Sequence, residues 1–108
     1  MICYQLEELE NIANRQSGIY IICDKSNKPL YIGMSTNLRT RLDYKRIQKL
    51  YVPYKASHAY VIFEDQLRFT ELWTLHCVEK KLIAFFNPPL NKNLYPFSAD
   101  FYKDRNIL

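Results

Sequence analysis

The pattern of apolar and polar positions predicts a helix and then a hairpin in the first third of the chain. Apolar residues recur at helical spacing near the N-terminus, which predicts a helix over about residues 5–15. Two apolar, β-branched runs at 19–23 and 30–33 flank a polar insert rich in turn formers. These two runs predict a β-hairpin.

The rest of the chain predicts a further helix, a strand and a long helix. Asn37 is a good helix N-cap residue, and an irregular helical pattern follows it as far as Pro53. Residues 59–63 predict a third strand, and residues 66–86 an amphipathic helix that ends before two prolines. The predicted fold is a small α/β (α+β) domain, in which a three-stranded, mainly antiparallel sheet is flanked by helices in the order α-β-β-α-β-α.

Length and composition place these elements in one domain, residues 1–108. An apolar content of 48% is enough for a core, and the three cysteines lack C-x-x-C spacing, so we expect free thiols. No run approaches the about 20 apolar residues of a membrane span, and the N-terminus does not resemble a secretory signal. We therefore expect a cytoplasmic protein that does not bind membranes.

Positive charge is concentrated in the middle of the chain. Residues 34–63 carry six basic side chains against one acidic side chain, whereas the flanking segments are close to neutral. Such a cluster is typical of a surface that contacts phosphates, and also of a solvated helix face. The candidate nucleic-acid contacts are Arg39, Lys45, Arg46 and Lys49.

A carboxylate interrupts the apolar stripe of the last predicted helix. Positions 72, 75, 79, 82 and 86 read Leu, Leu, Glu, Leu and Phe. A charge that faces a core is costly unless it is paired, hydrogen-bonded or bound to a metal. Either the helix is rotated so that Glu79 lies at the margin, or Glu79 pairs with an arginine, or it holds a hard cation such as Mg²⁺ for phosphodiester hydrolysis.

The hairpin carries two tyrosine motifs. Gly18-Ile19-Tyr20 and Tyr31-Ile32-Gly33 are separated by ten residues, and Arg41 follows the second motif tyrosine by ten residues. Asn91 follows Glu79 by twelve residues, in the segments EKKLI and PPLN. These elements, in this order, resemble the motifs of the GIY-YIG nuclease superfamily.

The resemblance covers about residues 17–92 and leaves an aromatic tail at 93–108 outside it. It implies a stand-alone, metal-dependent endonuclease that uses Mg²⁺, with Mn²⁺ able to substitute. The resemblance implies that Tyr20 and Tyr31 lie on either side of the attacking water and that Arg41 contacts the scissile phosphate. It also implies that Glu79 binds the metal and that Asn91 supports the site by hydrogen bonding. Which tyrosine acts as the base stays open.

Substrate and partners are less closely defined. Nucleic acid is expected, with DNA favoured over RNA and with little sequence specificity, since only the basic helix is available for binding. Single-stranded, duplex and branched DNA all stay open, as do a homodimer and a protein partner. The alternative function is a catalytically weak nucleic-acid-binding module that positions a partner nuclease.

Several other residues have two interpretations. Tyr44, Tyr51 and Tyr54 either stack on unpaired bases or pack against the hairpin, and Gly33 either allows a close approach or ends a strand. The chain departs from some relatives at two positions, with Met34 where they carry lysine and Lys45 where they carry histidine. Neither of the chain's histidines falls on a family motif, so we expect structural or solvated roles for His58 and His76.

Overall fold

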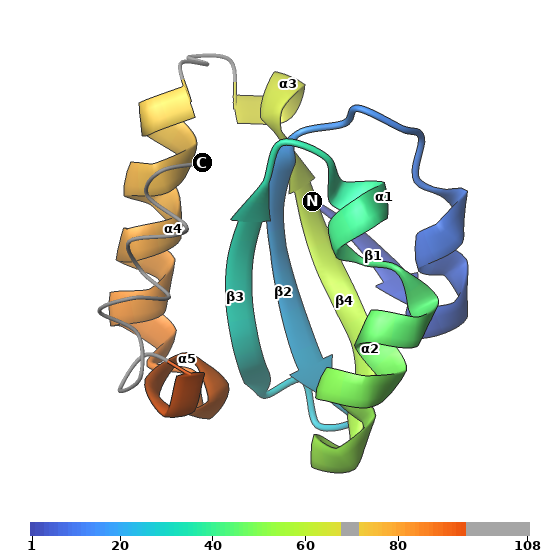
Figure 1. The fold of residues 1–108 in the computed structure, drawn as a ribbon. Coiled ribbons are helices and arrows are strands. Elements are labelled where there is room, and N and C mark those ends of the chain that lie inside the picture. Colours follow the sequence, from blue (N-terminus) through green and yellow to red (C-terminus); the bar gives the residue numbers. More distant parts are fainter. Residues whose placement is uncertain (68–71, 95–108) are drawn as a thin grey trace.

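The computed structural model of the chain describes residues 1–67 and 72–94. A four-stranded antiparallel sheet forms its centre, with the strands in the order β1-β4-β2-β3 (Figure 1). The strands are β1 (Ile2–Gln5), β2 (Gly18–Asp24), β3 (Pro29–Ser35) and β4 (Ala56–Phe63). An antiparallel sheet flanked by helices is confirmed, but the sheet has four strands rather than three.

The N-terminal helix predicted over 5–15 is shorter than predicted and of a different type. Residues Ile2–Gln5 form strand β1, which pairs with β4, and a 3₁₀ helix η1 (Leu6–Asn11) follows it. The apolar residues that suggested an α-helix lie three apart, which is the repeat of a 3₁₀ helix. The spacing therefore indicated the correct buried face and the wrong type of helix.

The predicted hairpin is confirmed as β2 and β3. The turn between them is closed by Asn27, whose positive φ of 68° suits the left-handed conformation that asparagine tolerates. The side-chain oxygen of Asn27 lies 2.6 Å from Nε2 of His58 and accepts a hydrogen bond of 2.9 Å from the Tyr60 hydroxyl. Of the structural and solvated roles expected for His58, its burial and this contact favour the structural one.

The basic segment forms two short helices instead of one. Asn37 caps α1 (Leu38–Arg41), because its side-chain oxygen accepts a hydrogen bond from the Thr40 amide at 3.5 Å. Helix α2 (Tyr44–Leu50) follows after a break, and Pro53 lies inside the 3₁₀ helix η2 (Val52–Tyr54) that comes next. The break lies where Asp43 adopts an extended conformation.

Among the described residues, the last part of the chain contains three helices where a single long one was predicted. After α3 (Glu64–Leu67), α4 (Leu72–Phe86) ends where the sequence predicted. Asn87 follows it with a φ of 51°, and Pro89 then begins α5 (Pro89–Leu94). Proline suits the first position of a helix, where its missing N–H would have no partner. Residues 68–71 of the predicted long helix, and 95–108 of the predicted tail, lie outside the described residues.

Alternating strand side chains divide the core between the two faces of the sheet. We call the face covered by η1, α1 and α2 the tyrosine face; its buried strand side chains include Tyr20, Ile22, Tyr31, Ala59 and Val61. The opposite face, which we call the aliphatic face, packs against α4 through Ile19, Ile21, Cys23 and Ile32, with Leu75 of α4 at the centre. Figure 1 shows α4 beside β3.

The three cysteines are free, as predicted. Burial raises the pKa of the Cys23 thiol to about 11, with a smaller effect of the Asp24 charge in the same direction. Cys3 and Cys77 are exposed. Within residues 1–67 and 72–94, no helix has the length and apolar character needed to cross a membrane.

Candidate active site

Tyr20 and Tyr31 lie together on the tyrosine face. In the register of β2 and β3, Tyr20 is opposite Gly33 and Tyr31 is opposite Ile22, so the two tyrosines are diagonal neighbours on the same side of the sheet. Their ring centroids are 6.1 Å apart, and the side chains are only 1% and 3% exposed. The structure thus brings both motif tyrosines into one buried cluster.

Gly33 makes room for the ring of Tyr20. A Cβ atom at Gly33 would overlap the hydroxyl oxygen and the ring carbon that carries it. The phenol of Tyr20 therefore lies across the backbone of β3, and its hydroxyl reaches the edge strand of the sheet. The sequence left two interpretations of Gly33 open, a close approach or the end of a strand. The structure favours the close approach, because the Tyr20 side chain lies against the backbone at Gly33.

Tyr51 is a member of this cluster that the sequence analysis did not assign to the site. Its ring centroid lies 5.7 Å from that of Tyr31, and its side chain is 5% exposed. Burial raises the pKa of Tyr51 well above the usual range, and the neighbouring Tyr31 acts in the same direction. Arg46, a side-chain hydrogen bond with Tyr20, and Arg41 lower this pKa, but by less. Tyr51 therefore stays protonated at neutral pH.

The sequence did contain a signal for Tyr51. It lies four residues after the buried Ile47, so it continues the buried stripe of α2 by one turn. Packing against the hairpin is thus the correct interpretation for Tyr51, whereas Tyr54 is 53% exposed. The side chain of Tyr44 is outside the described part of the structure.

Arg41 connects the basic segment to the tyrosine cluster. It is the last residue of α1, it is half-buried, and its positive charge is close enough to act on the pKa of Tyr51. The other basic candidates are exposed: Arg39, Lys45, Arg46 and Lys49. A phosphate bound beside the tyrosines would therefore meet one partly buried guanidinium, with further positive charge on the surrounding surface.

Glu79 is buried on the side of α4 that packs against the sheet. It is 3% exposed, and Leu75, one turn earlier, is fully buried. The interpretation that the helix turns Glu79 to its margin is therefore wrong. Nδ1 of His76 lies 3.6 Å from Oε1 of Glu79, and the His76 side chain is 36% exposed. Further along the same stripe, Phe86 is 42% exposed, so the stripe covers the sheet only in its earlier turns.

Asn91 binds the edge strand as a further strand would. Its Oδ1 accepts a hydrogen bond of 2.8 Å from the amide of Ile32, and its Nδ2 donates one of 2.9 Å to the carbonyl oxygen of Ile32. The side chain is 1% exposed. Because Ile32 lies between Tyr31 and Gly33, these bonds hold α5 against β3 at the point where the tyrosine motif lies.

The buried carboxylate of Glu79 on α4 is a ligand of the kind that a hard divalent cation prefers. Glu79 supplies a buried carboxylate, and His76 supplies an imidazole next to it. In the described parts of the chain, no group of three or more histidine, cysteine, aspartate or glutamate side chains is placed to hold a metal. A cation that keeps several water ligands, as Mg²⁺ does, needs only one or two protein ligands, so the residues present fit such an ion.

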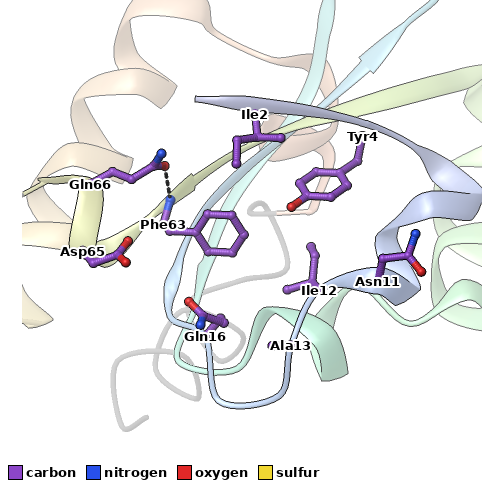
Figure 2. A pocket seen from close by; sticks show the side chains of 9 residues that line it. All are labelled: Ile2, Tyr4, Asn11, Ile12, Ala13, Gln16, Phe63, Asp65 and Gln66. Atoms are coloured by element: carbon purple, nitrogen blue, oxygen red, sulfur yellow. Dashed lines mark hydrogen bonds between the residues drawn. The ribbon is translucent and has the colours of Figure 1, made fainter.

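The candidate residues thus surround β3. The tyrosines and Arg41 lie on one face, Glu79 lies on the helix that packs along β3 on the other face, and Asn91 binds the edge. A separate pocket of about 370 Å³ lies near the N-terminus, between β1 and the end of β4; its lining residues, among them Tyr4, Ile12 and Phe63, include none of the predicted site residues (Figure 2).

A family model described as the GIY-YIG catalytic domain matches residues 16–85, which include both tyrosine motifs, Arg41 and Glu79. The chain belongs to the GIY-YIG family. It is an endonuclease of the GIY-YIG type. The search of curated proteins gave no match.

Solved GIY-YIG structures share its fold. The GIY-YIG N-terminal endonuclease domain of UvrC from Thermotoga maritima, bound to its catalytic cation magnesium, is 20% identical, has a TM-score of 0.59, and aligns over 78% of this chain and 92% of that chain. Variants of the same domain with one asparagine replaced by alanine or one tyrosine replaced by phenylalanine, each bound to the catalytic divalent cation, give 20% identity, a TM-score of 0.59, and coverage of 78% and 91%.

Two departures from other GIY-YIG sequences acquire a physical explanation. Met34, at a position where some relatives carry lysine, is half-buried and packs on the aliphatic face against the cluster around Leu75. It therefore contributes to packing in place of a charge. Lys45, where some relatives carry histidine, is exposed on α2, where it adds positive charge to the surface.

Proposed function

We propose that this GIY-YIG endonuclease hydrolyses phosphodiester bonds of DNA, uses one divalent cation, and has little sequence specificity. The observation that carries the proposal is the buried tyrosine pair, Tyr20 and Tyr31, next to the half-buried Arg41. Hydrolysis needs an oriented water, positive charge where the transition state gains negative charge, and a carboxylate to hold the metal. Each requirement has a candidate among residues that border β3.

The tyrosines are proposed to orient the attacking water and to accept its proton. A phenol has a reference pKa near 10, so it is a poor base at neutral pH unless positive charge lowers its pKa. Arg41, together with a cation held by Glu79, would supply positive charge near Tyr20 or Tyr31. Tyr51 is not assigned the role of base, because it lies outside the two tyrosine motifs; we assign it to hydrogen-bonding support of Tyr20.

Glu79 is proposed to hold the cation, Mg²⁺ or in its place Mn²⁺, and Asn91 to keep β3 in position. A bound cation would neutralise charge on the phosphate and so assist the departure of the leaving oxygen. The magnesium in the UvrC domain supports this assignment. Arg41 then contacts the scissile phosphate from the tyrosine face.

Binding to nucleic acid is assigned to the exposed basic side chains of α1 and α2: Arg39, Lys45, Arg46 and Lys49. Contacts of this kind are made to backbone phosphates, so they give affinity without reading sequence, and the affinity falls steeply with salt. We therefore propose DNA as the substrate, cleaved with little sequence specificity, and residues 1–108 as one catalytic domain.

A cleavage assay tests this proposal. End-labelled single-stranded, duplex, flapped and four-way-junction DNA and an RNA are incubated with Mg²⁺, with Mn²⁺ or with a chelator. We expect DNA cleavage that needs a cation and that falls by about 10²-fold or more in Glu79→Gln, as on removal of a group that stabilises transition-state charge. Lys80→Ala, an exposed neighbour on the same helix, is the matched control.

The outcomes separate the alternatives. Cleavage of RNA but not DNA would make the substrate assignment wrong. Binding of several substrates without cleavage of any would favour a nucleic-acid-binding module that positions a partner nuclease. Unfolding of the Glu79→Gln protein, measured by circular dichroism, would show that Glu79 serves the fold and would contradict its proposed role.

A further inference from the structure

His76 and Glu79 form a pair of neighbouring side chains on α4. They lie three residues apart on α4, so their side chains share one side of the helix. The distance between His76 Nδ1 and Glu79 Oε1 is 3.6 Å. A hydrogen bond between nitrogen and oxygen is about 2.7–3.2 Å long. The two atoms are therefore at the distance of an ion pair rather than of a short hydrogen bond.

The same distance suits two ligands of one cation. Ligand atoms about 2.1 Å from a metal ion, and separated at the ion by about 90–120°, are about 3.0–3.6 Å apart. The observed 3.6 Å lies at the wide end of this range. A cation between Nδ1 and Oε1 would therefore need little movement of either side chain.

The different exposure of the two side chains also suits this arrangement. The Glu79 side chain is 4% exposed, and the His76 side chain is 36% exposed. The carboxylate is held inside, while the imidazole borders the solvent, where an incoming ion and its water ligands have room. His58 differs from His76 in this respect, because it is buried and lies 2.6 Å from the Asn27 side-chain oxygen.

We propose that His76 and Glu79 together bind one divalent cation, and that the imidazole makes this site favour later first-row metals over Mg²⁺. The inference rests on the proposed role of Glu79 in holding the catalytic ion and adds a second ligand, which sets the choice of metal. Mg²⁺ prefers oxygen ligands, whereas affinity for nitrogen-containing sites rises from Mn²⁺ through Co²⁺ to Ni²⁺. Loss of the imidazole should thus weaken Co²⁺ binding far more than Mg²⁺ binding.

Calorimetry on the full chain without nucleic acid tests the metal preference. The protein carries no polyhistidine tag, and Co²⁺ and Mg²⁺ are titrated into the wild type and into His76→Ala. We expect His76→Ala to weaken Co²⁺ binding by about tenfold or more while changing Mg²⁺ binding by less than about threefold. Cys77→Ala, which removes an exposed thiol next to His76, is the matched control and should change neither.

A spectroscopic measurement detects the nitrogen ligand directly. Pulsed electron paramagnetic resonance of bound Mn²⁺ shows a modulation from a ligating ¹⁴N nucleus. We expect this modulation in the wild type and its loss in His76→Ala. The chain has two histidines, so the modulation should persist in His58→Gln, which would assign the ligating nitrogen to His76. The signal does not depend on catalysis, so it remains informative if the cleavage rate changes.

The results distinguish failure of this inference from failure of the proposed function. If Glu79→Gln abolishes cation binding while His76→Ala leaves the ratio of Co²⁺ to Mg²⁺ affinity unchanged and the nitrogen signal is absent, His76 is not a ligand and only this inference fails. A loss of Co²⁺ binding in Cys77→Ala, but not in His76→Ala, would also overturn it. If Glu79→Gln binds cations as the wild type does, the proposed metal role of Glu79 fails as well.

Discussion

The two faces of the sheet are built from different chemistry. The tyrosine face buries three hydroxyl-bearing rings, those of Tyr20, Tyr31 and Tyr51, among aliphatic side chains. The aliphatic face is a small apolar cluster centred on Leu75, and Glu79 is a buried charge on the helix that covers it. On the first face, then, the groups proposed to react are also core residues.

Because of this difference, stability and activity can be changed separately by substitutions on the two faces. A phenol contributes packing through its ring and chemistry through its oxygen, so deleting only the oxygen of Tyr20 or Tyr31 should spare the core. Leu75 contributes only packing, so truncating it should affect stability alone. This distinction would be wrong if removing a tyrosine hydroxyl mainly lowered stability, or if truncating Leu75 mainly lowered the cleavage rate.

The largest effect is expected from Tyr20→Phe and Tyr31→Phe. Loss of a group that transfers a proton in the transition state lowers the rate by about 10²–10⁴-fold. The free energy of unfolding should fall by only about 0.5–1.5 kcal/mol, the usual worth of one hydrogen bond. Single-turnover cleavage rates and urea unfolding measure the two quantities, and Tyr54→Phe, on an exposed ring, is the control. If both variants cleave at wild-type rates, neither tyrosine is the base.

Leu75→Ala should have the converse effect. Leu75 is fully buried at the centre of the aliphatic face, and a leucine truncated in a core costs about 2–5 kcal/mol. Below its unfolding transition the variant should cleave at close to the wild-type rate. Urea denaturation and the cleavage assay at low temperature test this. A large rate loss in protein that is still folded would show that packing under α4 also positions the reacting groups.

Gly33→Ala should destabilise the fold by less than Leu75→Ala does, and it should affect stability and activity together. The new methyl group would overlap the Tyr20 ring, and overpacking of this kind costs about 1–3 kcal/mol. Displacement of the Tyr20 hydroxyl should also lower the cleavage rate. A double-mutant cycle with Tyr20→Ala checks the cause, because without the ring the alanine should be tolerated. If the changes in unfolding free energy of Gly33→Ala and Tyr20→Ala simply add in the double variant, the methyl group does not overlap the Tyr20 ring.

The sequence predicted best what local patterns determine. Tyr20 and Tyr31 were placed on a hairpin because β-branched runs flank a polar turn, and Phe86 was placed at the end of a helix because prolines follow. Placement of Arg41 and Glu79 in a candidate site depended on motif spacing. The structure adds that Glu79 is buried and that Arg41 lies close enough to Tyr51 to act on its pKa.

What the sequence did not predict depends on contacts between distant segments. Residues Ile2–Gln5 become a strand because β4 offers them an edge to pair with, and no local pattern shows this. Tyr51 joins the site through Tyr31, twenty residues earlier in the chain. The sequence does not predict helix α5, because the two prolines that mark the end of α4 give no local sign that Pro89 also begins the next helix.

The hydrogen bonds of Asn91 have a further consequence, for self-association. β3 is an edge strand, and an edge strand presents unpaired amides and carbonyls to which the strand of another molecule can add. Asn91 occupies the outward-facing amide and carbonyl of Ile32, at the middle of that edge. A second copy therefore cannot extend the sheet through Ile32 without displacing α5, so the side chain that supports the tyrosine motif also protects the protein against edge-to-edge aggregation.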